Sequence, residues 1–144
     1  MQQYLVREVM SQPAIVIEWG ESILDASALM EARQVRRLPV VDDENIVIGI
    51  ISLGDVREAI SVYSTASPYA PDQDEVLLEV DEVMSTPAVT VTLDATLLEV
   101  VHLLLEHKVG GIPVVDMQRH PLGMITESDV FRLLIQHWEA ADKD

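Results

Sequence analysis

Two short motifs in this chain place a hydroxyl three residues before an aspartate. The first joins Ser52 to Asp55 in the stretch GIISLGDV, and the second joins Thr126 to Asp129 in GMITESDV, 74 positions further along. At a helix start this spacing is typical of a capping box, in which the hydroxyl and the acid each accept a hydrogen bond from a backbone N–H. The simplest interpretation is therefore structural: each motif only begins a helix.

The same motifs could also hold a ligand. Each follows a strand-like run that contains a glycine, Gly49 or Gly123, where a neighbouring backbone can approach closely. An aspartate on a first helical turn can accept hydrogen bonds from the paired hydroxyls of a ribose. The adjoining hydroxyl and the free N–H groups suit a phosphate. Spacing alone leaves both interpretations open.

These motifs belong to a unit that the chain contains twice. With the same shift of 74 positions, EVMSQPA (8–14) aligns with EVMSTPA (82–88), and VRRLPVVD (35–42) aligns with VGGIPVVD (109–116). Self-similarity at a fixed offset indicates a duplicated supersecondary unit. We expect the two copies to pack on each other as a pseudo-symmetric pair.

Each copy has the pattern of an α+β unit. A β-branched run after a proline predicts a strand, and a segment with helical apolar spacing follows it, with core positions Ile23, Ala26, Leu29 and Met30 in the first copy and Leu97, Val100, Val101 and Leu104 in the second. Two further strands predict a hairpin, and a last helix begins near Leu53 and Glu127. The predicted order is β-α-β-β-α. A short helix leads into each copy, so we expect one repeat over 1–60, an irregular acidic connector over 61–75 and a second repeat over 76–144.

Composition limits the partners. The chain has 144 residues, a formal net charge of −16 and no cysteine. Clustered Lys and Arg are needed to bind duplex nucleic acid or an anionic membrane, so neither partner is expected. Neither a signal peptide nor an apolar run long enough to cross a bilayer is evident, and a soluble cytoplasmic protein is predicted.

Other chemistry has little support in the sequence. The four histidines, His102, His107, His120 and His137, are scattered, and no metal site is predicted from them. Asp42 and Asp116 end the PVVD runs, where turn chemistry explains them better than catalysis. No nucleophile elbow or phosphate-binding loop is present. We therefore expect no enzymatic activity and no required cofactor.

The ordered motifs VxxVMSxP, PVVD and G-x-x-Ser/Thr-x-x-Asp-Val, present twice, resemble the CBS domain, and two such repeats resemble a CBS pair or Bateman module. The resemblance covers nearly the whole chain. It implies two pseudo-symmetric β-α-β-β-α repeats packed as a disc, which often associates into a homodimer. It also implies a regulatory sensor of adenine nucleotides such as AMP, ADP or ATP. The sequence of the second copy is similar to that of stand-alone CBS proteins of the acetoin-utilisation type.

The resemblance also implies site residues, position by position. The ribose carboxylate falls on Asp55 and Asp129, and each pocket takes its other wall from the opposite repeat. The implied Asp129 pocket contains Thr126, Ser128, Ala14, Val35 and Arg36. The implied Asp55 pocket contains Ser52, Gly54, Ala88, Val109 and Gly110, with Arg37 nearby. At these pocket positions the first copy has Arg36 and Arg37 where the second has Gly110 and Gly111, so the two sites are expected to be unequal.

Two alternatives remain at this point. The module could instead bind a nucleoside of the S-adenosylmethionine type. It could also bind no ligand and serve to dimerise or to dock on a partner enzyme or transporter through the apolar face of the last helix, VFRLLIQHWEA (130–140).

Overall fold

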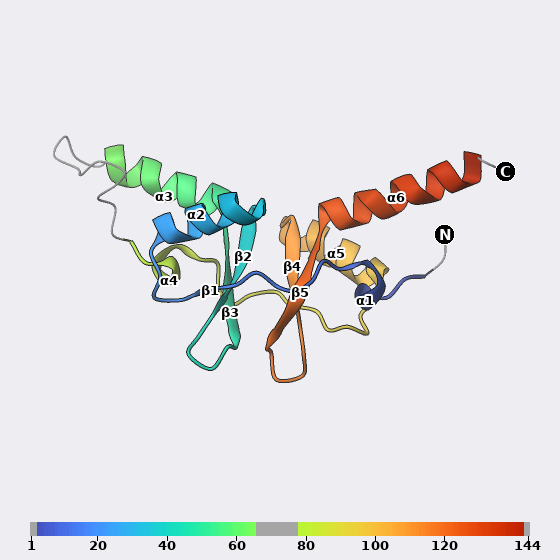
Figure 1. Ribbon diagram of the computed structural model, residues 1–144, viewed down its shortest axis with the longest axis horizontal. Helices are drawn as coiled ribbons and strands as arrows, with labels where there is room; N and C mark the ends of the chain where they lie inside the picture. The colour runs from blue at the N-terminus through green and yellow to red at the C-terminus, as the bar shows by residue number, and fades with distance from the viewer. Residues whose placement is uncertain (1–2, 66–77, 143–144) are drawn as a thin grey trace. The chain divides into compact units, whose positions relative to one another are not determined.

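The computed structural model describes residues 3–65 and 78–142, and it divides into two compact units. The first unit is Ile15–Ala88, and the second unit combines Met1–Ala14 with Val89–Asp144. Each contains helices and strands in the α+β manner that the sequence predicts (Figure 1). Of the predicted connector, residues 61–65 continue a helix, and the remainder lies outside the described residues.

The first unit is built on a sheet of order β1-β2-β3. Its strands are β1 (Ile17–Glu18), β2 (Arg37–Val41) and β3 (Val47–Ser52). β1 runs parallel to β2, and β2 and β3 form an antiparallel hairpin. The helices α2 (Ile23–Arg33) and α3 (Leu53–Thr65) contact each other and the strands, and the short helix α4 (Val80–Val83) completes the unit.

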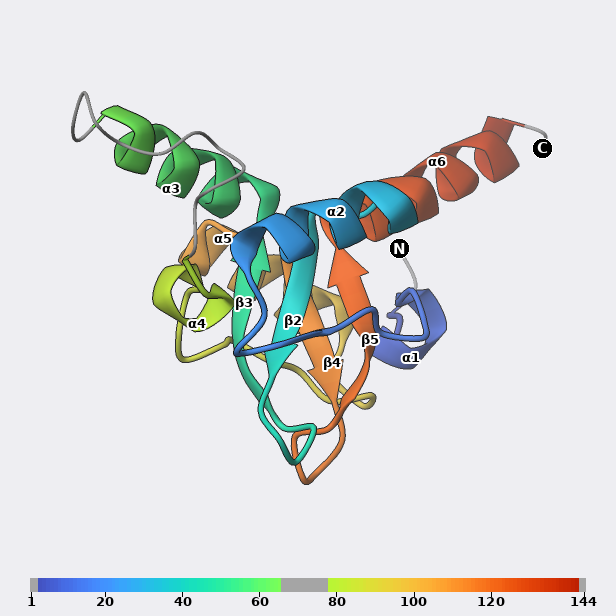
Figure 2. The same cartoon turned by 60° about the vertical axis from the view of Figure 1, so that its left-hand side comes forward.

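The second unit repeats this plan with a smaller sheet, which Figure 2 shows from another side. The antiparallel strands are β4 (Gly111–Val115) and β5 (Pro121–Thr126). Its helices are α1 (Val6–Val9), α5 (Leu97–His107) and α6 (Glu127–Asp142). The strand predicted in the β-branched run after Pro87 is reduced to a single parallel bridge between Val91 and Val114.

Each unit has its own apolar core, and the helical spacing read from the sequence selects much of it. Ile23, Ala26 and Met30 of α2 are buried in the first unit. The repeat-equivalent residues Leu97, Val100 and Leu104 of α5 are buried in the second. Burial of a large aliphatic side chain stabilises a fold by about 1.5–3 kcal/mol. Leu29 and Val101 are only partly buried, at the edges of these cores.

The lead-in segments pack against the helices of the other sequence repeat. In the second unit the N–H of Val6 donates to Ala95 O (2.8 Å), and the N–H of Leu97 donates to Tyr4 O (2.8 Å). In the first unit the same two bonds join Val80 to Glu21 O and Ile23 to Leu78 O. Residues before the first copy thus complete the second unit, and residues before the second copy complete the first. The predicted short lead-in helices are present as α1 and α4, with four residues each.

The predicted turn chemistry of the PVVD aspartates is confirmed. Asp42 Oδ1 accepts the N–H groups of Glu44 and Ile46, at 2.9 and 3.0 Å. Asp116 Oδ1 accepts the equivalent groups of Gln118 and His120, at 2.9 and 2.8 Å. Both side chains therefore close a hairpin loop. Within the described part of the chain, no helix is long and apolar enough to cross a membrane.

Candidate functional site

Both Ser/Thr-x-x-Asp motifs form capping boxes, at the starts of α3 and α6. Asp55 Oδ2 accepts from Ser52 N (2.9 Å), while Ser52 Oγ accepts from Asp55 N (3.0 Å). Asp129 Oδ2 accepts from Thr126 N (2.9 Å), while Thr126 Oγ1 accepts from Asp129 N (3.4 Å). The capping interpretation is confirmed, and each box uses one oxygen of its carboxylate. What the other oxygen does distinguishes the two units.

The glycines in the motifs allow a third segment to reach each site. A Cβ on Gly123 would overlap the carbonyl oxygen of Ser11, and one on Gly49 would lie 2.9 Å from that of Ser85. The space lets Ser11 exchange two backbone hydrogen bonds with Met124 of β5, at 2.8 and 2.9 Å. The expected close approach at both glycines is therefore observed, and in the second unit it brings Ser11 of the VMS motif to the helix start at Asp129.

In the second unit both oxygens of the Asp129 carboxylate are engaged. Oδ1 accepts from Ser11 Oγ (2.8 Å) and from Arg132 Nη2 (2.7 Å). Oδ2 accepts from the N–H of Thr126 and also from Thr126 Oγ1 (3.2 Å). The Asp129 side chain is 3% exposed, whereas that of Arg132 is 64% exposed. Asp129 is thus a buried charge with four donors and its own counterion.

In the first unit the Asp55 carboxylate is half-buried and less engaged. Its Oδ2 serves the capping box, but Oδ1 accepts no hydrogen bond from the described residues. The position equivalent to Arg132 is Glu58, which supplies no counterion. Asp55 is therefore the carboxylate with an oxygen left for a ligand.

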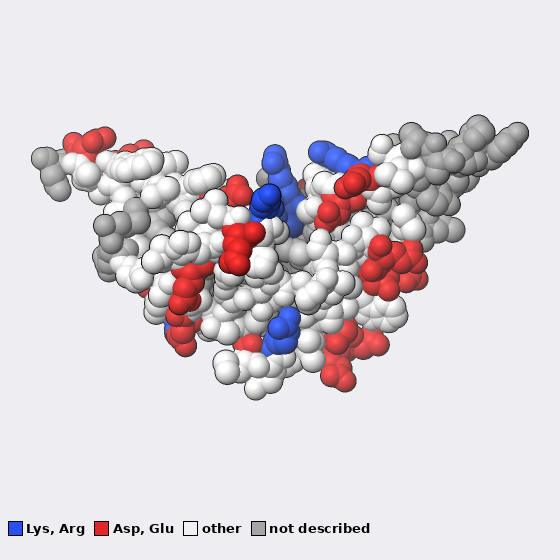
Figure 3. All heavy atoms as spheres, turned by 180° about the vertical axis from the view of Figure 1, so that it is seen from behind, with Lys and Arg blue, Asp and Glu red and all other residues white. Residues whose placement is uncertain are grey.

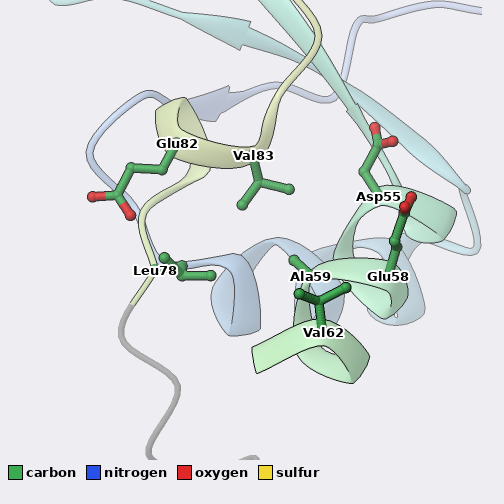
Figure 4. Close-up of a pocket in the computed structure, with 7 residues that line it drawn as sticks. All are labelled: Asp55, Glu58, Ala59, Val62, Leu78, Glu82 and Val83. Carbon is green, nitrogen blue, oxygen red and sulfur yellow. The ribbon is translucent and has the colours of Figure 1, made fainter. Parts of the chain in front are cut away.

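A hollow beside Asp55 leaves space for a ligand next to this carboxylate. It is an open hollow of about 420 Å³, lined by α3, by α4 and by Leu78, two residues before α4. Figure 4 shows Asp55 and Glu58 together on α3, with Glu82 across from them on α4 and apolar side chains between. The lining residues are Asp55, Glu58, Ala59, Val62, Leu78, Glu82 and Val83.

The second unit has the equivalent hollow, but it is smaller, at about 150 Å³. Its lining residues are Glu8, Val9, Asp129, Arg132, Leu133 and Gln136. Each is the repeat partner, 74 positions away, of a residue that lines the larger hollow. Arg132 replaces Glu58 and Leu133 replaces Ala59, so a longer cation and a larger aliphatic side chain occupy the space.

The backbone of Arg36 and Arg37 lies beside the start of α3. The backbone oxygen of Arg36 accepts from Leu53 N (2.7 Å), and Arg37 is paired with Ser52 in the β2–β3 register. In the second unit Gly110 O and Gly111 take these places beside Glu127 and Thr126. Few basic side chains are present on the face in Figure 3, and acidic ones are spread over it. The neighbours of the first motif are therefore arginines, whereas those of the second motif are glycines.

The predicted site residues divide between the units as follows. The first unit contains Ser52, Gly54, Asp55, Ala88, Val35, Arg36 and Arg37. The second contains Thr126, Ser128, Asp129, Ala14, Val109 and Gly110. Gly54 and Ser128 are exposed on the first turns of their helices. The pairing of Asp129 with Val35 and Arg36, and of Asp55 with Val109 and Gly110, stays a prediction.

Sequence reasoning missed four residues of these sites. Ser11 and Arg132 bind Asp129, and Glu58 and Glu82 line the larger hollow. The spacing of three residues from Asp129 to Arg132, and from Asp55 to Glu58, was a signal for two of them. Ser11 and Glu82 come from lead-in segments, whose packing partner the sequence did not identify.

Two carboxyl groups outside the boxes have shifted pKa values. Partial desolvation and the neighbouring charge of Asp81 raise the pKa of Glu79. Hydrogen bonds from the backbone N–H and the ring of His120 hold the pKa of Asp116 below its ordinary value. Among the residues that the structure describes, no cluster of three or more His, Asp or Glu side chains could hold a metal ion.

Comparison with known proteins identifies the class of this module. The sequence model of the CBS domain matches residues 6–62 and 80–136. The chain therefore belongs to the CBS domain family and carries two CBS repeats. It is 33% identical over 138 residues to a CBS domain-containing protein of Dictyostelium discoideum, with 92% of each chain covered. It also matches 23% of the length of an L-aspartate semialdehyde sulfurtransferase of Methanocaldococcus jannaschii, at 27% identity and with 90% of this chain covered.

Solved structures agree with the fold. The CBS domain pair of protein MJ0100, in complex with 5′-methylthioadenosine and S-adenosyl-L-methionine, has a TM-score of 0.80 and 25% identity, covering 94% of this chain and 99% of that one. The protein CBSX2, in complex with AMP, has a TM-score of 0.72 and 27% identity, covering 92% and 97%. The fold class, a tandem CBS pair of α+β repeats, is thereby confirmed.

Proposed function

We propose that this CBS pair is a regulatory, non-catalytic sensor of an adenosine-type ligand. The observation that supports it most directly is the state of Asp55. Its carboxylate begins α3 with Oδ1 uncommitted among the described residues, beside Ser52 and near the backbone of Arg36 and Arg37. A ribose offers two neighbouring hydroxyl donors to such an oxygen. Two CBS structures similar to this chain hold adenosine compounds.

The ligand that we propose is an adenine nucleotide of the AMP, ADP or ATP type. A nucleoside of the S-adenosylmethionine type is the alternative chemistry. Asp55 is the stronger of the two candidate carboxylates, because a ribose at Asp129 would have to displace Ser11 or Arg132 from a buried charge. We therefore expect the two sites to differ in affinity, with the Asp55 site filled first. Binding would then shift the population between arrangements of the module. We place this activity in the cytoplasm, with no cofactor required.

Thermal unfolding with single ligands tests the proposal. AMP, ATP, S-adenosylmethionine and 5′-methylthioadenosine are added one at a time. A ligand at a hundred times its dissociation constant stabilises the folded state by about 2.7 kcal/mol. We expect Asp55→Ala to remove the largest shift, while Gly20→Ala, at an open position outside the predicted site residues, retains it. A module that none of the four compounds stabilises would contradict the proposal.

A second role, self-association as a homodimer, is supported by an exposed apolar face on α5 and α6. Leu105, Phe131 and Ile135 are 73%, 55% and 50% exposed, and a groove of about 520 Å³ runs between the two helices. The first repeat provides an internal comparison, because its equivalent residues are Glu31, Arg57 and Ser61. The fold therefore does not require apolar side chains there, and a second copy of the same helix pair would bury them.

The oligomeric state in solution checks this second role. Phe131→Arg introduces the residue that the first repeat has, and we expect it to convert a dimer to a monomer in sedimentation analysis. Met117→Ser, an exposed apolar residue in a turn, is the matched control. A wild-type chain that is monomeric at about 100 μM, well above the dissociation constants of stable dimers, would exclude it.

A further inference from the structure

The hollows beside Asp55 and Asp129 are lined by equivalent positions of the two repeats, so their side chains can be compared directly. In the second unit the site contains a carboxylate, Asp129, and a guanidinium, Arg132, bonded at 2.7 Å. In the first unit the carboxylate is kept as Asp55, but Glu58 stands where the arginine was. The larger hollow thus keeps the carboxylate, Asp55, but has no equivalent of the guanidinium that binds the carboxylate in the second unit.

The larger hollow is suited to positive charge. Of the seven described residues that line it, three are acidic and none is basic. The carboxylates of Glu58 and Glu82 form no ion pair with any described residue. Acidic residues on both helices that line the hollow raise the local concentration of cations and disfavour an anion such as a phosphate.

The remaining lining residues are suited to an alkyl chain. Ala59, Val62, Leu78 and Val83 lie between the acids of α3 and the acid of α4 (Figure 4). Ala59 takes the place of Leu133, which leaves room for several methylene groups. The volume, about 420 Å³ against about 150 Å³, is within the range of small-molecule sites.

We propose that this hollow binds a small organic cation, a free alkylguanidine or alkylamine. The charged group contacts Asp55 Oδ1 and Glu58, as the Arg132 guanidinium contacts Asp129, and the alkyl chain lies on the apolar residues. The site stands apart from the proposed adenosine-type site, except that both use Asp55. Occupancy of the hollow would therefore alter the carboxylate on which the other site depends.

Two isosteric compounds test the proposal, because n-butylguanidinium and n-butylurea differ in charge but hardly in shape. Each is titrated into the wild-type protein at low, matched ionic strength without any nucleoside, and amide NMR shifts are followed. We expect butylguanidinium to bind with a dissociation constant on the order of 1 mM and to perturb the first unit. Butylurea is expected to bind at least about tenfold more weakly. Equal binding of the two compounds, or none by butylguanidinium up to about 20 mM, would overturn the proposal.

Variants locate the site. Glu58→Gln should weaken butylguanidinium binding about fivefold, whereas Glu31→Gln, an exposed acid of α2 outside the hollow, should leave it unchanged. The double variant Glu58→Arg/Ala59→Leu copies the second unit and should abolish binding. Its fold is checked by thermal unfolding. Equal affinities of Glu58→Gln and Glu31→Gln would refute the location. Since no nucleoside is present, failure here leaves the adenosine-type proposal to its own ligand screen.

Discussion

Asp129 and Asp55 occupy equivalent positions in the two repeats but have different hydrogen-bond partners. The same substitution at each position should therefore change the stability of the protein by different amounts, and each position serves as a control for the other. The perturbation is a change of aspartate to asparagine at each position, which keeps size and shape but removes the charge and one acceptor oxygen. Asp129 is buried and accepts four hydrogen bonds, whereas Asp55 is half-buried and uses one oxygen. We expect Asp129→Asn to be the more destabilising variant.

The magnitude follows from the donors that each carboxylate serves. In Asp129→Asn the new amide group must face either Ser11 and Arg132 or the two donors of Thr126. A charge-assisted hydrogen bond contributes about 1.5–3 kcal/mol, while the exposed Arg132 adds no more than about 1 kcal/mol. In Asp55→Asn the amide can take the place of Oδ1, so the main loss is the favourable charge at a helix start, about 0.3–1 kcal/mol. The two variants should differ by about 2 kcal/mol.

Calorimetric unfolding measures this difference. For a chain of this length, about 2 kcal/mol corresponds to about 6 °C in Tm. If the two units unfold separately, Asp129→Asn should lower only the transition of the second unit. Ser128→Ala, on the same helical turn but exposed, is the control. Equal Tm decreases for Asp129→Asn and Asp55→Asn, within about 1 °C, would refute the reasoning.

Three further outcomes follow. Gly123→Ala should destabilise the protein by about 1–3 kcal/mol in urea unfolding, because its Cβ meets the Ser11 backbone, whereas Gly20→Ala, with open space around it, should cost less. Glu79 has a raised pKa, so its ionised form opposes folding. Glu79→Gln should raise Tm at neutral pH, and this gain should vanish once acidification protonates Glu79. Asp116 has a lowered pKa, so Asp116→Asn should lower Tm at neutral pH, and the gap should close as the pH falls through that lowered pKa.

The sequence determined the fold class and the helix starts of this protein. Local contacts produce the capping boxes at Ser52 and Thr126 and the hairpin turns at Asp42 and Asp116. The buried stripes of α2 and α5 follow from a single helical period. The duplication then fixed the same plan for both units. These signals are local, so they could be predicted without knowing which segments meet.

Only the tertiary structure decided what surrounds the two aspartates. The lead-in segments bring Ser11 to Asp129 and Glu82 to the hollow beside Asp55, through packing between residues far apart in sequence. The two motifs look alike as sequences, yet Arg132 satisfies one carboxylate while Glu58 leaves the other with an oxygen to offer. The Arg132 or Glu58 difference lies three residues along the same helix and can be read from the sequence. The approach of Ser11 and Glu82 cannot, because it depends on contacts between segments far apart in the chain, about which periodicity carries no information.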